Sequence, residues 1–324
     1  MSPGNGIRRE EGMDYNIDDW SKGTSPGELQ EMADLWNGNA VGRHAFYSWT
    51  GELLAGSIAP SGKIAGRLVE ARNDSGELLG FAHASLLAEE GYPPAGVVEM
   101  LMVDRKSRDK GIGTGLLAET IRWIESRRPR PWLVDALGAW PFGYVYNVLA
   151  DGSERSGVFT RETALYRLFQ RAGFVPVRKS IVMRADLAGV PARPHPPGSG
   201  FFIAPRREGT WLDRVFRGRE LWDHELEMRE EGTLSRSIFG LMEGESRQEG
   251  RILFSLFGVN TPADKQGRGY AGANLSHLMN HVRGLGGEVM ELHVYADNKP
   301  ALALYRGLGF KPVAETAMMH LQLR

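Results

Sequence analysis

Gln266-Gly267-Arg268-Gly269-Tyr270-Ala271 joins an apolar run, Ile252 to Val259, to a helical pattern, Ala273 to Val282. We expect a strand, a Gly-rich turn and a helix in this order. Such a turn binds anions, because the N–H groups at a helix start point outward and the helix dipole places roughly half a positive charge there. The glycines allow positive φ angles and close approach of a ligand to the backbone. The stretch therefore predicts a phosphate-binding turn.

The same arrangement occurs earlier in the chain. Arg108-Asp109-Lys110-Gly111-Ile112-Gly113 follows the apolar run Val97 to Val103 and precedes the helical pattern Leu116 to Ile124. Each of the two turns is followed by a strand, a helix and a Gly-Phe pair, at Gly173-Phe174 and Gly309-Phe310. The two copies are separated by the length of a whole domain. Such a repeat indicates duplicated domains, since solenoid repeats are far shorter.

Both turns resemble the acyl-CoA-binding segment of the GNAT N-acetyltransferase family. That motif runs Gln or Arg, two residues, Gly, one residue, then Gly or Ala. The resemblance covers nearly the whole chain and implies two tandem α/β GNAT domains, each a mixed, mostly antiparallel central sheet flanked by helices. We place the domains at 25–187 and 201–324, with a mobile tail at 1–24 and a linker rich in Pro and Gly at 188–200.

The resemblance also implies acetyl-CoA as cosubstrate. In the family, the amides of the turn hold the CoA pyrophosphate, and the preceding strand pairs with the pantetheine arm. The residues that this assigns to acetyl-CoA binding are Val103, Arg108, Lys110, Gly111, Ile112 and Gly113 in the first half, and Val259, Gln266, Gly267, Arg268, Gly269, Tyr270, Ala271 and Asn298 in the second.

The expected general acid is present in the second half only. The family carries a tyrosine on the helix after the next strand, and Tyr305, four residues before Gly309, stands at that place. Asn298, seven residues earlier, matches a residue that contacts the pantetheine or the helix start. In the first half the tyrosine position is Phe169, and Tyr166 lies one helical turn earlier. Tyr305 and Asn298 are also plausible as an amphipathic core residue and an N-cap, respectively.

The expected general base follows the opposite pattern. Glu99 lies on the strand before the first turn, where many GNAT enzymes carry a base, and Ser255 is at the corresponding place in the second half. A structural ion pair with an arginine is the other interpretation of Glu99. Neither half is complete by the family pattern. Tandem members such as mycothiol synthase are similar in their division: the C-terminal domain does the chemistry and the N-terminal domain is degenerate.

We therefore predict an N-acetyltransferase that acts on a primary amine of a small molecule, with chemistry in the C-terminal domain. The alternatives are catalysis in the N-terminal domain with Glu99 as base, or a non-catalytic CoA-binding or scaffold protein. A Rossmann-type oxidoreductase is disfavoured, because the spacing of Gly111, Gly113 and Gly115 does not match the dinucleotide fingerprint.

The composition limits the partners and the chemistry that we expect for this chain. The formal net charge is −1, which gives no general attraction to nucleic acid or to an anionic membrane, and no apolar run approaches the roughly 20 residues that span a bilayer. The chain has no cysteine, which excludes disulfides and a cysteinyl acyl intermediate. We expect a cytoplasmic protein; the sequence leaves its oligomeric state open.

Two further features of the sequence each have a structural and a functional interpretation. His277 and His281 have a spacing that suits zinc, but an exposed helix face is the favoured interpretation and we predict no metal. The aromatic stretch Gly138 to Phe159 lengthens the first half by comparison with the second. It either packs the two domains together or forms the wall of a substrate cleft.

Several secondary elements are expected from the pattern. Ser25 and Glu28 suit a capping box at a helix start. Trp211 to about Glu230 is expected to be helical, and Gly244 to Gly250 a polar turn. The second half then has one strand fewer before its turn than the first, unless Phe201 to Ala204 forms another strand.

Overall fold

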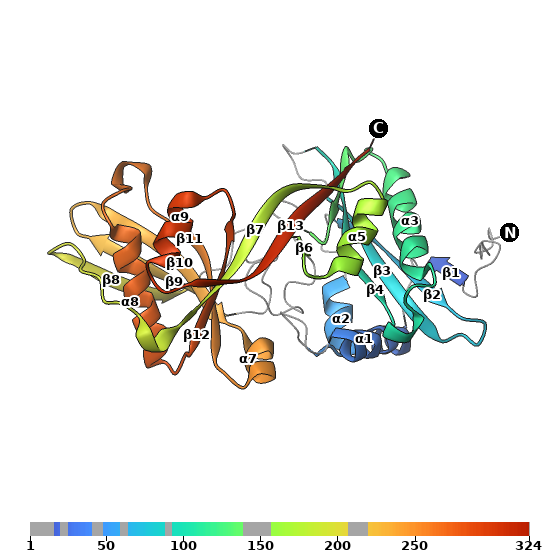
Figure 1. Ribbon diagram of the computed structural model, residues 1–324, viewed down its shortest axis with the longest axis horizontal. Helices are drawn as coiled ribbons and strands as arrows, with labels where there is room; N and C mark the ends of the chain where they lie inside the picture. The colour runs from blue at the N-terminus through green and yellow to red at the C-terminus, as the bar shows by residue number, and fades with distance from the viewer. Residues whose placement is uncertain are drawn as a thin grey trace.

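The computed structural model describes residues 16–19, 25–40, 48–58, 64–87, 93–138, 157–206 and 220–323. They form two lobes, one from each half of the chain, that share a continuous sheet (Figure 1). The predicted fold class, two tandem α/β domains built on a mostly antiparallel sheet flanked by helices, is confirmed. The described residues include no helix long and apolar enough to cross a membrane.

The first lobe has helices on both faces of its sheet. Apolar side chains of the strands alternate between two cores, one against the first pair of helices and one against the second. Ser25 and Glu28 form the expected capping box: the Ser25 N–H donates to Glu28 Oε2 over 2.6 Å, and the Glu28 N–H donates to Ser25 Oγ over 3.4 Å. In chain order the elements are β1 (Asn16–Asp19), α1 (Pro26–Ala40), α2 (Gly51–Ile58), β2 (Ile64–Arg72), β3 (Leu78–Leu87), β4 (Ala95–Val103), η1 (Arg105–Ser107), α3 (Ile112–Glu125), β5 (Leu133–Ala136), β6 (Val158–Phe159) and α5 (Thr163–Arg171). Helices α1 and α2 lie on one face of the sheet, and α3 and α5 lie on the other.

The second lobe has a similar order of strands. Two of its helices pack on the sheet mainly through one apolar cluster. The elements are η2 (Leu187–Gly189), β8 (Ser199–Pro205), β9 (Leu221–Met228), β10 (Gly232–Leu241), α7 (Glu243–Glu249), β11 (Leu253–Asn260), η3 (Ala263–Lys265), α8 (Tyr270–Gly284), β12 (Val289–Tyr295) and α9 (Lys299–Arg306).

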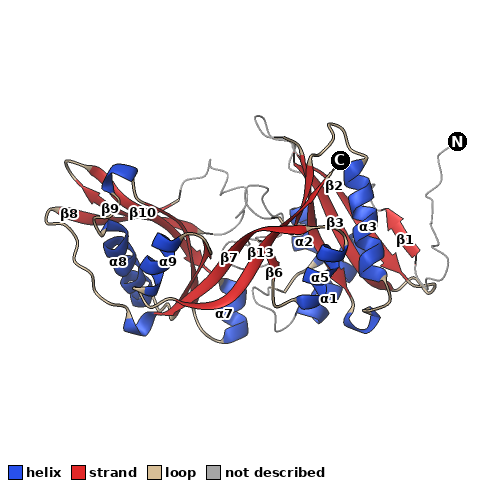
Figure 2. Ribbon diagram, turned by 45° about the horizontal axis from the view of Figure 1, so that its top comes forward, coloured by secondary structure: helices blue, strands red, loops and turns tan. Residues whose placement is uncertain are grey.

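Two long strands exchange partners between the lobes. β7 (Val175–Asp186) follows the first lobe but pairs antiparallel with β12 of the second. β13 (Lys311–Gln322) follows the second lobe but pairs antiparallel with β5 of the first. β7 and β13 also pair with each other, and both views show them crossing side by side between the lobes (Figures 1 and 2). The strand order is β1-β2-β3-β4-β5-β13-β7-β12-β11-β10-β9-β8, with β6 paired to β13.

The exchanged strands carry core residues of the opposite lobe. Ala317 and Met319 of β13 are buried in the cluster that α3 and α5 cover. Met183 and Ala185 of β7 are buried in the cluster that α8 and α9 cover. Each lobe therefore completes its hydrophobic core with side chains from the other half of the sequence. The division of the chain at 188–200 stays a prediction, and the sheet itself continues across it.

The aromatic stretch lies between two short strands. β12 pairs with β7 along its whole length, whereas the described residues of the first lobe form β5 and the two-residue β6 at the corresponding place. Thr316 lies opposite Phe159 and Ser180 lies opposite Tyr295, which makes β6 the counterpart of the end of β12. The chain between these two pieces, residues 139–156, lies outside the described residues. Neither interpretation of this stretch is tested.

Four expectations about secondary structure change. The predicted helix from Trp211 to Glu230 is wrong over β9, which is a strand; residues 207–219 lie outside the described residues. The predicted turn at Gly244 to Gly250 is largely the short helix α7. The additional strand near Phe201 exists as β8. Part of the predicted tail, Asn16–Asp19, is β1, which pairs antiparallel with β2.

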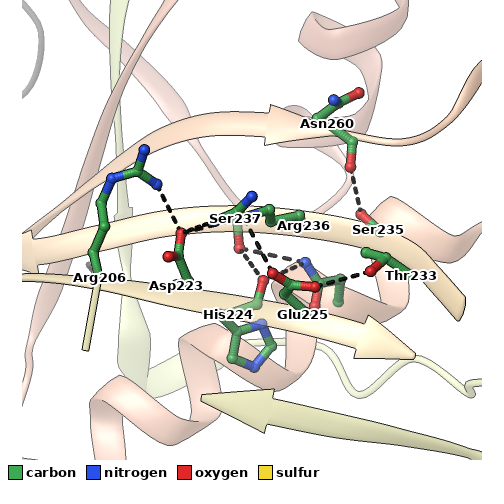
Figure 3. A network of polar contacts seen from close by, with 10 residues as sticks. Arg206, Asp223, His224, Glu225, Thr233, Ser235, Arg236, Ser237 and Asn260 are labelled. Carbon is green, nitrogen blue, oxygen red and sulfur yellow. Dashed lines mark hydrogen bonds and ion pairs between the residues drawn. The ribbon is translucent and has the colours of Figure 1, made fainter. Parts of the chain in front are cut away.

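A polar network connects the edge strands of the second lobe (Figure 3). The helix prediction missed the alternation along β9, which is the pattern of a strand: charges lie on one face, and His224 and Leu226 face α8. Asp223 accepts from Arg206 over 2.9 Å and pairs with Arg236 over 2.8 Å. Cross-strand pairs of this kind stabilise neighbouring strands.

Candidate active site

The two Gly-rich turns have the same backbone conformation. Gly111 and Gly269 are the N-caps of α3 and α8, and each has a φ of 82°. Two residues earlier, Asp109 and Gly267 also have positive φ angles, of 62° and 76°. Lys110 and Arg268 stand between these positions in the two copies, and both are exposed. Each turn therefore presents the start of a long helix and a basic side chain to solvent, which suits an anion.

The first residue of each motif makes the same contact. Arg108 Nε donates to the carbonyl of Val103 over 3.3 Å, and Gln266 Nε2 donates to the carbonyl of Thr261 over 3.1 Å. Thr261 is thus the counterpart of Val103. The two turns have the same spacing from their strands, since η3 follows the start of β11 at the same distance along the chain as η1 follows the start of β4. Val259, assigned from the sequence as the match of Val103, lies two residues before the true counterpart.

Each lobe has an opening between two parallel strands next to its turn. The parallel pairs of β4 and β5 end at Val98 opposite Ala136, and those of β11 and β12 end at Leu256 opposite Leu292. Beyond these points β4 and β11 continue toward the turns without parallel partners among the described residues. The sheet therefore splits at equivalent positions in both lobes. A split of this kind exposes backbone groups that a ligand's amides can pair with.

A β-bulge follows each split. In β4, His83 pairs with Met100 and Ala84 pairs with Val98, which leaves Glu99 as the additional residue. In β11, Gly258 and Val259 lie between the pairs of Arg236 with Asn260 and Ile238 with Phe257. Gly258 has a φ of 50°. A bulge turns one backbone N–H out of the ladder, and such a group can donate to an oxyanion.

Tyr305 and Phe169 occupy equivalent places. Tyr305 is 7% exposed and packs edge-to-face on Phe310, with ring centroids 5.8 Å apart. Phe169 is fully buried and packs edge-to-face on Phe174, at 5.0 Å. The phenol hydroxyl is the chemical difference between the two lobes at this position. Asn298 caps α9, because its Oδ1 accepts from the Ala301 N–H over 3.2 Å.

Glu99 is buried beside a hydroxyl. Its Oε1 accepts a hydrogen bond from Ser85 Oγ over 2.5 Å, and the residue is 2% exposed. Ser85 lies on the face of β3 that also carries Phe81, opposite the face that packs on α3. His83 is buried on the same face, and burial lowers its pKa to about 4. Glu99 therefore lies on the α1 side of the opening, across the sheet from the helix start of α3.

Two buried pairs were missed by sequence reasoning. Asp135 Oδ2 lies 3.2 Å from His320 Nε2, and Glu291 Oε2 accepts from Arg184 Nε over 2.7 Å. Both carboxylates are fully buried and lie one residue before the split of their strands. A carboxylate inside an otherwise apolar strand was the available signal. The basic partner of each carboxylate could not be found from the sequence, because it lies on an exchanged strand.

The histidines of α8 pack on aromatic side chains of the neighbouring strands. His277 Nδ1 lies 2.9 Å from His224 Nε2, and the His277 ring stacks on Phe201 with centroids 3.7 Å apart. The described residues contain no group of three His, Cys, Asp or Glu side chains that could hold a metal ion. The predicted exposed face also needs correction, since His277 and His281 are half-buried.

Comparison with known proteins agrees with this geometry. A model of the acetyltransferase (GNAT) family matches residues 29–142 and 210–310, which together make up more than half of the chain. The chain belongs to the GNAT acetyltransferase family. Each matched region contains one Gly-rich turn and one split pair of strands, so that the chain is a tandem GNAT protein and an acyltransferase.

The chain is similar to several acetyltransferases and GNAT proteins. The chain is 26% identical to a mycothiol acetyltransferase of Saccharomonospora viridis, over 76% of this chain and 80% of the relative. A tandem GNAT protein from the clavulanic acid biosynthesis pathway has a similar fold, with a TM-score of 0.70, 15% identity and coverage of 94% and 98%. A GCN5-related N-acetyltransferase from Sphaerobacter thermophilus has a TM-score of 0.60, at 17% identity and coverage of 95% and 96%.

Proposed function

We propose that this chain transfers an acetyl group from acetyl-CoA to a primary amine of a small molecule, with the chemistry in the second lobe. The observation that carries the proposal is Tyr305. It takes the place of Phe169 in an otherwise equivalent packing arrangement, beside an equivalent turn and strand split. A phenol there supplies a proton donor that the first lobe lacks at this position.

The reaction needs three groups. Deprotonating a lysine-like amine at pH 7.4 costs about 4 kcal/mol, so a base assists attack on the thioester. An N–H donor stabilises the tetrahedral oxyanion, and an acid protonates the leaving thiolate. In the second lobe the bulge at Gly258 and Val259 is the candidate donor, and Tyr305 is the candidate acid.

The cosubstrate site follows from the turns. The N–H groups at the starts of α3 and α8 suit the pyrophosphate of acetyl-CoA, and the exposed Lys110 and Arg268 add positive charge beside them. The unpaired edges of β4 and β11 beyond the splits suit the amides of the pantetheine arm. We therefore assign one acetyl-CoA site to each lobe.

The first lobe is the second candidate place for chemistry. Glu99 stays the residue proposed as its base, because it is a carboxylate at the bulge of the strand before the turn. The names of the relatives support a small-molecule acceptor: one is a mycothiol acetyltransferase and one comes from the clavulanic acid biosynthesis pathway. We infer no acceptor beyond this class.

A direct assay tests the proposal. A panel of small primary amines is incubated with the full chain and acetyl-CoA, and the released CoA thiol is measured. We expect amine-dependent thiol release that saturates with at least one amine. A chain that binds acetyl-CoA by calorimetry but releases no thiol with any amine would instead be a CoA-binding scaffold.

A further inference from the structure

The two buried carboxylate pairs stand at equivalent places in the lobes. Asp135 lies opposite His320 in the register of β5 and β13, and Glu291 lies opposite Arg184 in the register of β12 and β7. His320 and Arg184 stand at the same position when each is counted from the first residue of its strand. Each exchanged strand therefore delivers one basic side chain to a carboxylate of the opposite lobe.

The chemistry of the two pairs differs. Arg184 also donates to Glu249 of α7 over 2.7 Å, and a guanidinium keeps its charge at any working pH. This arrangement is a fixed ion pair. In the first lobe the basic partner is an imidazole, which can accept and release a proton near neutral pH. Asp135 is fully buried, while the His320 side chain keeps 14% of its surface exposed.

The imidazole pair lies beside the opening of the first lobe. Asp135 pairs with Val97 in the parallel register, and the register ends one residue later, at Val98 and Ala136. Val134 and Ala136 face α3, so Asp135 projects from the opposite face. That face also carries Ser85 and, bonded to it, Glu99. Both acidic groups and His320 thus lie on the α1 side of the split.

We propose that Asp135 and His320 form the acid–base dyad of a second acetyl-transfer site in the first lobe, one that the last strand of the chain completes. His320 takes a proton from the ammonium group of a small primary amine, and the buried Asp135 stabilises the resulting imidazolium. The amine nitrogen forms a bond to the thioester carbon, and the C–S bond breaks. The CoA sulfur leaves as a thiolate, and the second amine proton passes to it through solvent, because Phe169 offers no proton.

His320 rather than Glu99 takes the proton in this account. Glu99 is 2% exposed and already accepts a hydrogen bond from the hydroxyl of Ser85, whereas the imidazole of His320 is partly exposed at the surface. A buried carboxylate behind a partly exposed imidazole is the arrangement that orients a histidine as a base. The inference rests on the proposed acetyl transfer, but it assigns the first lobe a base other than Glu99.

The test uses the full chain carrying Tyr305→Phe, which disables the proposed site of the second lobe. Residual thiol release from acetyl-CoA with an amine that is active in the panel is then measured. Adding His320→Gln should lower this residual rate at least tenfold, as should Asp135→Asn, and Glu99→Gln should lower it less. With His320→Ala, added imidazole should restore part of the rate, which a merely structural histidine would not show.

The matched control is His293→Gln in the same Tyr305→Phe chain. His293 Nε2 also lies near a buried carboxylate, 3.9 Å from Glu291 Oε1, but in the second lobe, so the residual rate should not change. The inference is overturned if Tyr305→Phe alone leaves no amine-dependent release, or if His320→Gln and His293→Gln have the same effect. It is also overturned if Glu99→Gln abolishes the rate and His320→Gln does not. If Tyr305→Phe is silent and His320→Gln abolishes turnover, the dyad is supported and the proposed second-lobe site fails.

Discussion

Ser180 lies directly opposite Thr316 in the pairing of β7 with β13, and these residues are counterparts in the two halves. Both strands are 12 residues long, and Ser180 and Thr316 stand at the same position when counted from their first residues, Val175 and Lys311. The point where a residue meets its own counterpart is the centre of an approximate two-fold relation between the lobes. Both residues are 1% exposed. The two halves are therefore joined at their centre by paired backbone and not only by the linker.

This pairing predicts that a cut linker leaves the lobes together. A protease site placed at 194–197 allows cleavage after folding, and the two fragments should then elute as one particle in native buffer. Denaturant should be needed to separate them, because each fragment supplies core residues of the opposite lobe, such as Met319 and Met183. Fragments that separate without denaturant would contradict the strand exchange.

The truncated chain is the control for this experiment. A chain that ends before Lys311 lacks β13 and with it Ala317 and Met319 of the first core. Loss of a buried methionine alone costs about 2–5 kcal/mol in typical cores. We expect the first lobe of the truncated chain to unfold at markedly lower urea concentration, as followed by hydrogen exchange of β4.

The phosphate-binding turns predict two acetyl-CoA sites for each chain. Gly269→Asp places a carboxylate at the start of α8 and should abolish one of two sites in calorimetry. Gly269→Asn is the control, because asparagine tolerates the positive φ of this position and adds no charge. An added Cβ meets no atom within 4 Å there, so steric exclusion is not expected. Asp and Asn variants that bind alike would contradict the turn as a phosphate site.

The same pair of changes at Gly111 tests the first lobe. Gly111 is the structural counterpart of Gly269, whereas Gly113, the counterpart of Ala271, lies inside α3. A Cβ at Gly113 would lie 3.3 Å from Leu168, so a change there disturbs packing as well as charge. Gly111→Asp should therefore remove the other acetyl-CoA site and leave the one in the second lobe. If the Gly111→Asp chain still bound two acetyl-CoA molecules, the acetyl-CoA site of the first lobe would have to lie at a surface other than this turn.

Buried histidines predict loss of stability in mild acid. Burial lowers the pKa of His224 to about 3, with the neighbouring His277 as a further cause, and lowers that of His83 to about 4. The unfolded chain protonates these groups near pH 6.5, but the folded chain does not. Stability is thus full above pH 6.5 and falls as the pH drops toward 4, by about 2 kcal/mol for each histidine at pH 5.

Urea unfolding at pH 7.5 and pH 5 checks this expectation. In His224→Gln the difference in unfolding free energy between the two pH values should shrink by about 2 kcal/mol. His195→Gln, at an exposed position of the linker region, is the matched control and should leave the difference unchanged. An unchanged difference in His224→Gln would mean that His224 is protonated in the folded state.

The sequence predicted those parts of the fold that depend on local chemistry. Glycines at 111 and 269 give the turns, and the apolar strands and amphipathic helices around them follow from periodicity. β9 was predicted as helix although Asp223 and Glu225 lie two residues apart, a spacing that puts them on one face of a strand and on opposite faces of a helix. The strand exchange could not be predicted, because β7 and β13 have the same apolar pattern whichever lobe they pair with.

The candidate site was predictable to a similar extent. Tyr305 and Glu99 follow from their distances to Gly309 and Val103 within one half. Asp135 and His320 belong to opposite halves of the chain, and only the pairing of β13 with β5 brings them together. Ser255 was taken as the counterpart of Glu99 because Val259 was matched with Val103, whereas the constant offset between the halves places Phe257 there.

The measurement that tests the central claim most directly compares Tyr305→Phe with Tyr166→Phe in the full chain. Tyr305→Phe keeps the ring packed on Phe310, so that acetyl-CoA binding by calorimetry should persist while thiol release falls about 10²- to 10⁴-fold, the range for a lost general acid. Tyr166→Phe should change neither quantity. Full turnover in Tyr305→Phe together with loss of turnover in Tyr166→Phe would contradict the account and place the chemistry in the first lobe.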